Sequence, residues 1–287
     1  MTVAESYTDV FYTIPDGLTL YARDYSGPAA DSPVVLCLHG LSRNSRDFAD
    51  LAPLLQRSHR VIVPDQRGRG RSEWDPKPER YTPTTYMGDM LVLLEQLSVT
   101  SCALVGTSMG GLMGFGLHAL APGLLTHLVI NDIGPVLGQE GLARIKQYVG
   151  STMSFPDWGA AISYISEANA AVFPHYTKQD WASFTRRMCT EKEGSVWLDY
   201  DPLISAPMKS PEGEAELATL WPLYDGLKDL SLMLIRGGAS DLLDPSCAAE
   251  MRARHPDMVY LEVPGVGHAP MLDEPGVADA ICGFINS

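Results

Sequence analysis

The sequence alternates short apolar runs with longer segments along most of its 287 residues. The runs have the length of strands and the segments between them the length of helices, which is the pattern of a parallel α/β sheet. Strands that helices cover on both faces are apolar nearly throughout, as these runs are. Eight strands are predicted, the first two as a hairpin: Val10–Ile14, Leu18–Tyr25, Val34–Leu38, Val61–Val63, Cys102–Val105, Leu128–Asn131, Leu232–Arg236 and Met258–Val263. Helices are predicted at about Ser45–Arg57, Thr84–Leu97, Met109–Leu120, Pro245–Arg254 and Glu274–Phe284.

The alternation stops once, between Asn131 and Ser231, where no strand is evident. This stretch is too long for a simple crossover, so we expect it to hold its own helices. The sequence therefore predicts a core domain of residues 1–134 and 226–287, with a helical cap at 135–225 inserted before the last two strands. Half of the chain's aromatic residues lie in this cap. They either pack the cap itself or line a cavity over the sheet.

Charge and targeting signals restrict the partners. The chain has 21 Lys and Arg against 35 Asp and Glu, a net charge of −14. This balance argues against nucleic acid or anionic membranes as partners, because both are bound by basic patches. Met1–Ser6 lacks the features of a signal peptide, and no apolar stretch is long enough to span a membrane. The five cysteines are widely spaced and form no C-x-x-C, which favours a reducing compartment, the cytoplasm, over zinc or redox sites.

The strongest local signal is the stretch 105–111 (VGTSMGG), directly between a predicted strand and a predicted helix. It fits G-x-S-x-G in the strand–turn–helix context in which a serine becomes a nucleophile. A serine on so sharp a turn has a positive φ, and Gly106 and Gly110 relieve the crowding around it. The turn lifts Ser108 to the carboxyl end of the sheet, where open α/β sheets bind ligands.

A serine needs an oriented base, and the base needs a carboxylate. His268 lies in the flexible loop 265–270 (GVGHAP) after the last predicted strand and is the predicted base. Asp241, on the glycine-rich loop after the penultimate strand, is the predicted carboxylate. Asp132, after the strand that precedes the cap, is the main alternative. Asp244 is a near neighbour that we expect to cap a helix instead.

Backbone N–H groups next to the nucleophile form the predicted oxyanion hole. Met109 supplies one at a helix N-terminus, and Leu41 supplies the other from the loop after Val34–Leu38. His39 precedes this loop and is interpreted as a ring that shapes it. Candidate residues for substrate contact are His39, Trp158, Trp181 and His175.

Five motifs in order resemble the α/β-hydrolase family over about residues 10–285. They are His39-Gly40, Asp65–Ser72 as D-x-R-G-x-G-x-S, Gly106–Gly110 as the nucleophile elbow, Asp241–Pro245 as D-x-x-x-P, and Gly267-His268 followed by Glu274-Pro275. The resemblance implies an α/β-hydrolase fold, with a mostly parallel eight-stranded sheet, helices on both faces and a helical cap. Asp65, Arg67 and Ser72 are expected to hold a loop by hydrogen bonds.

The resemblance also implies acyl transfer to Ser108 and release of the acyl group by water. The aromatic-rich cap indicates a small-to-medium apolar substrate, which favours a carboxylesterase or lactonase, and no metal or organic cofactor is expected. The expected partner is thus a small ester or lactone, and the oligomeric state is left open. One alternative is a carbon–carbon hydrolase of ring-fission diketones, which needs a cation for the dienoate carboxylate: Arg43, Arg186 or Arg187. A second, from another class, is a small-molecule receptor with slow turnover.

Overall fold

A computed structural model describes residues 7–209 and 219–287 of the chain. Two segments considered above, Met1–Ser6 and the part of the predicted cap at 210–218, lie outside the described residues. None of the helices described has the length and apolarity needed to cross a bilayer.

One eight-stranded sheet organises the fold, in the order β1-β2-β4-β3-β5-β6-β10-β11. β1 and β2 form an antiparallel hairpin, β2 pairs antiparallel with β4, and the other neighbours are parallel. All eight predicted strands are present, and the sheet confirms the predicted α/β fold class. The strands are β1 (Thr8–Thr13), β2 (Thr19–Tyr25), β3 (Val34–Leu38), β4 (Arg60–Asp65), β5 (Cys102–Thr107), β6 (Leu125–Asn131), β10 (Ser231–Gly237) and β11 (Val259–Val263).

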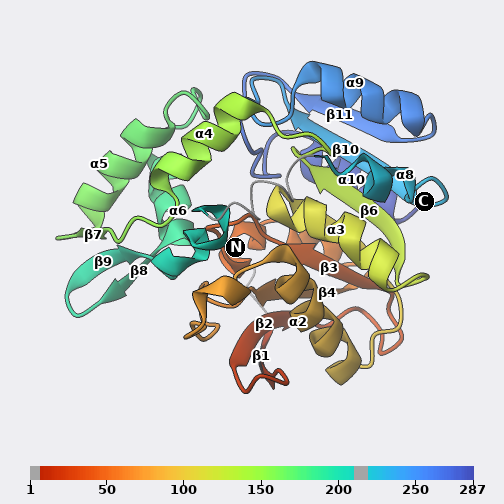
Figure 1. The fold of residues 1–287 in the computed structure, drawn as a ribbon, viewed down its shortest axis with the longest axis horizontal. Coiled ribbons are helices and arrows are strands. Elements are labelled where there is room, and N and C mark those ends of the chain that lie inside the picture. The colour runs from red at the N-terminus through yellow and green to blue at the C-terminus, as the bar shows by residue number, and fades with distance from the viewer. Residues whose placement is uncertain (1–6, 210–218) are drawn as a thin grey trace.

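Helices cover both faces of this sheet (Figure 1). Alternate residues of a strand point to opposite faces, so Leu104 of β5 packs in one apolar cluster while Ala103 and Val105 pack in the other. Helices α2, α3, α8 and α9 contribute to the first cluster, and α1 and α10 to the second. Their bounds are α1 (Ala52–Leu55), α2 (Pro83–Gln96), α3 (Met109–Leu120), α8 (Trp221–Asp225), α9 (Pro245–Arg254) and α10 (Val277–Ile285).

Two predicted helices differ from the structure at proline. The segment expected as one helix at 45–57 is a 3₁₀ turn, η1 (Ser45–Phe48), followed by the short α1. Pro53 lies in the first turn of α1 and has no N–H, so an incoming helix cannot continue through it. α10 begins at Val277 instead of Glu274, because Pro275 and the left-handed Gly276 (φ 81°) precede it.

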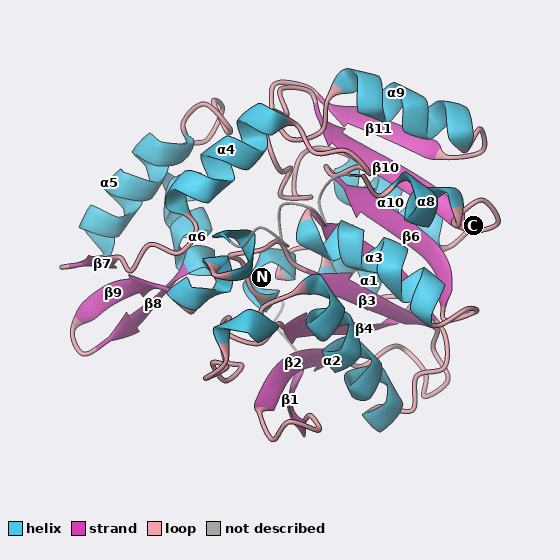
Figure 2. Ribbon diagram, viewed as in Figure 1, coloured by secondary structure: helices cyan, strands magenta, loops and turns pink. Residues whose placement is uncertain are grey.

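Residues 135–209, between β6 and the second described range, are named the cap segment here. Figure 2 shows this segment beyond the carboxyl ends of the parallel strands, with its own small sheet. The segment contains helices, and it also contains three short antiparallel strands that were not evident from the sequence, which pair in the order β7-β9-β8. Its elements are α4 (Gln139–Tyr148), β7 (Ser154–Phe155), α5 (Trp158–Asn169), α6 (Lys178–Met188), β8 (Cys189–Lys192), β9 (Ser195–Leu198), η3 (Pro202–Ser205) and η4 (Pro207–Lys209).

The hairpin of β8 and β9 was missed because its strands are short and partly charged. Glu191 and Lys192 lie in β8, so no apolar run marks the strand in the sequence. The sequence feature that indicates a hairpin is the turn between the two strands. Glu193 and Gly194 both have positive φ (53° and 75°), and they join the paired residues on either side as a two-residue hairpin loop.

The turn after β4 is held as the sequence predicted. The Asp65 carboxylate accepts hydrogen bonds from the N–H groups of Ser45 (2.6 Å) and Arg71 (2.9 Å). The Ser72 hydroxyl donates to the Asp65 carbonyl at 2.6 Å. These bonds fix the end of β4 against the loop that follows β3, and η2 (Pro78–Arg80) lies further along the same connection.

Arg67 is the cation of a buried network in the same turn. Its guanidinium donates twice to Asp89, at 2.8 and 2.6 Å, and also contacts Asp75 and Asp16. The side chains of Arg67, Asp75 and Asp89 are almost fully buried. Removal of the arginine would therefore leave buried carboxylates without their counter-charge.

We expect Arg67→Ala to lower the free energy of unfolding by about 3–5 kcal/mol, as for other buried pairs broken on one side. Arg71→Ala is the control, since the Arg71–Asp9 pair is nearly half exposed and such pairs contribute about 1 kcal/mol or less. Urea unfolding of the two variants measures both values. Equal losses would show that the Arg67 network does not stabilise the turn.

Candidate active site

Ser108 lies on a strained turn between β5 and α3, with φ 52° and ψ −115°. A Cβ on Gly106 would lie 2.4 Å from the Gly110 carbonyl, and a Cβ on Gly110 would lie 2.2 Å from the Leu38 carbonyl oxygen. Both glycines are therefore required by close backbone approach, as the motif indicated. The turn places Ser108 at the carboxyl edge of the sheet, facing the cap segment.

A continuous hydrogen-bond chain joins three side chains at this edge. His268 Nε2 lies 2.9 Å from Ser108 Oγ, and His268 Nδ1 lies 2.9 Å from Asp132 Oδ2. An ionised carboxylate can only accept a hydrogen bond, so it holds the proton of the neutral ring on Nδ1. Nε2 is then free to accept the proton of Ser108. The predicted serine and histidine are thus brought together in the geometry of nucleophile and base.

Asp132 is fixed by backbone contacts with the neighbouring strand. Its N–H donates to the Ile235 carbonyl at 2.8 Å, and its Oδ1 accepts from the Gly237 N–H at 2.8 Å. Its side chain is fully buried. The remaining oxygen, Oδ2, faces His268. These contacts fix the orientation of the carboxylate, and His268 is the ring that it holds.

The prediction that Asp241 orients His268 is wrong. Asp241 accepts two hydrogen bonds from Arg144 of α4, at 2.7 and 2.9 Å, and it makes none with His268. The loops after β6 and β10 open at the same sheet edge, so order along the chain could not separate the two aspartates. Asp132 follows β6 immediately, and its carboxylate contacts Gly237 of β10 and His268. The Gly-rich loop after β10 instead places Asp241 beside Arg144 of α4. Asp244 occupies the N-cap position of α9, without a side-chain capping bond.

The loop after β3 passes beside Ser108. A Cβ on Gly40 would lie 3.7 Å from the Ser108 Cβ. His39 Nδ1 lies 2.7 Å from the Gly40 carbonyl, and its Nε2 accepts from the Gln66 N–H at 3.1 Å. Nδ1 therefore carries the proton and donates it to Gly40. Because a trans peptide directs its N–H opposite to its carbonyl, this bond also sets the direction of the Leu41 N–H.

His39 is completely buried under this loop, which agrees with its interpretation as a structural ring. Burial lowers the pKa of His39 to about 4, so the ring is neutral at neutral pH. Arg69 donates to the Leu41 carbonyl at 2.9 Å and fixes the next peptide of the loop. Met109, the other predicted donor, is the first residue of α3, and the first N–H groups of a helix have no partner within it.

A cavity of about 180 Å³ opens at Ser108 and His268, and it is called the catalytic cavity here. Its walls come from the loop after β3, from the histidine loop and from helices α4, α5 and α6 of the cap segment. The side chains that line it include Leu41, Arg43, Arg144, Tyr148, Tyr164, Ile165, Asn169, Phe173, Phe184, Met188, Tyr200 and Met271.

None of the four predicted substrate-contact residues lines the catalytic cavity. His39 lies beneath its loop, and His175 lines a different cavity. Trp158 lies at the start of α5, two turns before Ile165, and donates to Glu191. Trp181 packs edge-on against Phe173 and Phe184, which are the rings that do face the cavity. Aromatic enrichment identified the correct segment, but it could not say which face of each helix turns inward.

Two arginines line the catalytic cavity, and each is paired with an aspartate. Arg43 donates to both oxygens of Asp47, at 2.8 and 2.5 Å, and lies over the Phe184 ring at 4.5 Å. Arg144 holds Asp241 in the same two-point manner and lowers the pKa of that carboxyl. Arg43 is one of the cations that the sequence suggested for a substrate carboxylate. Arg144 was not predicted, and its one sequence signal is its place on an amphipathic helix of the cap.

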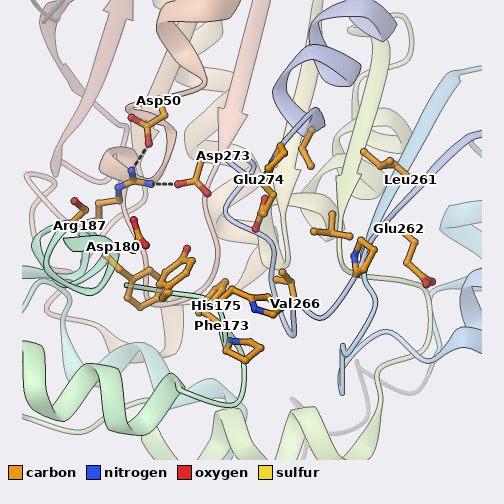
Figure 3. A pocket seen from close by; sticks show the side chains of 18 residues that line it. Asp50, Phe173, His175, Asp180, Arg187, Leu261, Glu262, Val266, Asp273 and Glu274 are labelled. Atoms are coloured by element: carbon orange, nitrogen blue, oxygen red, sulfur yellow. Dashed lines mark hydrogen bonds and ion pairs between the residues drawn. The ribbon is translucent and has the colours of Figure 1, made fainter. Parts of the chain in front are cut away.

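The other two predicted cations lie elsewhere. Arg186 lies over the Trp158 ring at 4.6 Å. Arg187 lines a second cavity of about 710 Å³ between the cap segment and the histidine loop, which is called the outer cavity here (Figure 3). There it contacts Asp50 and lies 3.6 Å from Asp273. The larger cavity is thus not the one that holds the nucleophile.

The outer cavity shares two walls with the catalytic cavity, Phe173 and Phe184. Its opposite side carries Glu274, which accepts a hydrogen bond from the Met271 N–H at 2.8 Å. Burial raises the pKa of Glu274. Within residues 7–209 and 219–287, no three His, Cys, Asp or Glu side chains converge as metal ligands would.

Comparison with known proteins gives the family. Residues 35–280 match a model of the alpha/beta hydrolase family. The chain is 35% identical over 268 residues to a 3-hydroxybutyrate-oligomer hydrolase of Cupriavidus necator, covering 91% of each protein. It is 27% identical over 275 residues to a 2-(acetamidomethylene)succinate hydrolase of Mesorhizobium japonicum, covering 94% of this chain and 92% of that one.

A solved structure agrees with this result. A crystal structure of an alpha/beta hydrolase from Novosphingobium aromaticivorans superposes with a TM-score of 0.93 at 38% identity, and the match covers 99% of both chains. The family match spans the nucleophile turn, Asp132 and His268. The chain therefore belongs to the alpha/beta hydrolase family.

Proposed function

We propose that this chain is a serine esterase that cleaves a short carboxylic ester through an acyl-enzyme on Ser108. The observation that carries the proposal is the unbroken chain from Ser108 through His268 to Asp132, with both contacts at 2.9 Å. A hydroxyl, a base with one free nitrogen and a buried carboxylate on the other nitrogen make up an activated nucleophile. The 35% identity to a 3-hydroxybutyrate-oligomer hydrolase supports an ester as the substrate.

In the proposed reaction Ser108 Oγ attacks the ester carbonyl carbon while His268 Nε2 takes the hydroxyl proton. Asp132 stabilises the imidazolium that forms. The tetrahedral intermediate then collapses, and the departing alcohol receives the proton from His268. Water attacks the acyl-enzyme in the second half, with His268 again as base. Release of the carboxylic acid restores Ser108.

The proposed oxyanion hole consists of the N–H groups of Met109 and Leu41. One stands at the N-terminus of α3, where helix N–H groups favour negative charge. The other belongs to the peptide whose carbonyl accepts from His39. In this scheme His39 is a positioning residue, because it sets the orientation of a donor without touching the substrate. Each oxyanion donor contributes roughly 3–4 kcal/mol to such reactions.

The size of the catalytic cavity supports a small substrate. Its volume of about 180 Å³ lies below the range of roughly 300–1,000 Å³ that drug-sized ligands occupy. Its walls combine apolar side chains, such as Phe184 and Met188, with a few polar groups, such as Asn169. A short hydroxyalkanoate ester or lactone matches this lining better than a long acyl chain.

Two further points belong to the proposal. We place the chain's core in residues 1–134 and 226–287, and its cap in 135–225, with α8 at the end of that range packed against α3 of the core. We also place the enzyme in the cytoplasm, which its five free cysteines support, since four of them are buried thiols without a disulfide.

A panel of esters tests the reaction. We expect wild type to hydrolyse p-nitrophenyl esters with short acyl chains and 3-hydroxybutyrate dimers, with rates that fall as the chain lengthens beyond the cavity. γ- and δ-lactones and one ring-fission diketone complete the panel. Ser108→Ala should keep its circular dichroism spectrum but lose turnover and labelling by an organophosphonate. Consumption of the diketone alone would identify a carbon–carbon hydrolase. Less than one turnover per chain on every compound of the panel would identify a receptor.

Two isosteric changes test the carboxylate. In Asp132→Asn the side-chain amide would donate to His268 Nδ1 and reverse the tautomer, so kcat should fall about 10⁴-fold. Asp241→Asn should lower kcat far less, because Asp241 does not contact His268. Initial rates on p-nitrophenyl butyrate compare the two. A larger loss in Asp241→Asn would assign the triad carboxylate to the loop after β10.

His39 gives the folded state a predictable acid sensitivity. Its pKa is about 4 when folded and about 6.5 when unfolded, so unfolding takes up a proton between these values. The stabilisation from its neutral ring is complete above about pH 6.5 and is lost as the pH falls towards about 4, by roughly 3 kcal/mol in total. Urea unfolding between pH 4 and 7 should therefore show a steeper slope in wild type than in His39→Gln. Parallel curves would contradict a depressed pKa.

A further inference from the structure

Arg144 is the polar group of the catalytic cavity that is best placed to recognise a charged substrate. It lies on α4 of the cap segment and lines the same cavity as Ser108 and His268. Its Nε and Nη2 atoms hold the two oxygens of Asp241, at 2.7 and 2.9 Å. This is the two-point geometry with which arginine binds carboxylates in general.

The Arg144–Asp241 pair is open to exchange, and the second arginine pair of the cavity is not. The side chains of Arg144 and Asp241 are 32% and 29% exposed, whereas those of Arg43 and Asp47 are 13% and 11% exposed. Arg43 is also covered by the Phe184 ring. Water and salt reach this partly exposed pair and screen its attraction more than they screen that of a buried pair. Another carboxylate can therefore compete with Asp241 for Arg144 more readily than with Asp47 for Arg43.

The backbone around this pair is fixed, so an exchange needs only side-chain rotation. The Gly138 N–H donates to the Leu242 carbonyl at 2.8 Å, and the Gly141 N–H donates to the Asp241 carbonyl at 3.1 Å. A Cβ on either glycine would lie within 2.8 Å of the backbone of the Asp241 loop. The N-terminus of α4 therefore rests directly on the backbone of this loop, and the contacts that hold it do not involve the Asp241 side chain.

We propose that Arg144 binds a free carboxylate of the substrate, and that Asp241 occupies this position in the empty enzyme. The substrate class is then an ester of a hydroxy acid that ends in a carboxylate, such as the free-acid dimer of 3-hydroxybutyrate. Water adds across the ester in the overall reaction: its hydroxyl goes to the acyl carbon and its proton to the alkoxy oxygen. The released hydroxy acid keeps the carboxylate that Arg144 held. This inference rests on the proposed esterase function.

The test compares the free-acid dimer with its methyl ester, which lacks the terminal charge and carries one additional methyl group; cleavage of the internal ester is measured in both. The measured quantity is the ratio of kcat/KM for the acid to kcat/KM for the ester. A hydrogen-bonded charge pair corresponds to about a 10- to 100-fold preference, so wild type should favour the acid by that factor. Arg144→Gln should bring the ratio close to one. Asp241→Asn should raise the ratio above that of wild type, because it removes the competing carboxylate.

Arg43→Gln is the matched control, since it removes the other arginine of the same cavity. It should leave the ratio at the wild-type value, whatever it does to the two rates. A wild type without preference, or an Arg144→Gln variant with the wild-type ratio, would overturn the proposal. So would a lower ratio in Asp241→Asn.

Failure of the esterase proposal is recognised separately. If wild type hydrolyses neither dimer, the proposed function is wrong. The carboxylate site is then tested by measuring the binding of a hydroxy acid to the protein. Calorimetry with 3-hydroxybutyrate on Ser108→Ala, with and without Arg144→Gln, makes that measurement. Binding that disappears with Arg144 supports the site, and binding that is independent of Arg144 overturns it.

Discussion

The candidate site depends on the pairing of β6 with β10. This parallel contact brings Asp132 to the Ile235 carbonyl and the Gly237 N–H, which together hold its backbone and one carboxylate oxygen. The other oxygen is then aimed at His268, and through it at Ser108. The strained turn after β5 and the loop after β3 add a nucleophile and N–H groups at the same edge. Without the pairing of β6 with β10, the carboxylate of Asp132 would lose the contacts that aim it at His268.

Much of this could be predicted because it depends on local pattern. Strand runs, the elbow glycines and the histidine loop each leave a signal within a few residues, and the eight strands and the Ser108–His268 pair followed from them. The acid could not be assigned in this way. Asp132 and Asp241 both follow strands that end at one edge, and the choice between them depends on side-chain direction across the sheet, which no local pattern contains.

In the cap segment too, local sequence pattern could not predict which side chains face the cavity. Its aromatic content indicated a packed layer over the cavity, yet the inward-facing residues are those of particular helix faces, such as Tyr164 with Ala168 on α5 and Phe184 with Met188 on α6. The charged pair of Arg144 and Asp241 joins the cap to the core across almost a hundred residues of sequence, and only the folded chain brings its members together.

The two cavities share an aromatic wall. Phe173 and Phe184 line both the small cavity at Ser108 and the larger one beside the histidine loop. If the chain is the esterase proposed here, these two side chains bound the acyl group on the side of the outer cavity. Replacement of one of these phenylalanines by a smaller residue would join the two cavities and admit longer substrates, while Ser108, His268 and Asp132 stay unchanged.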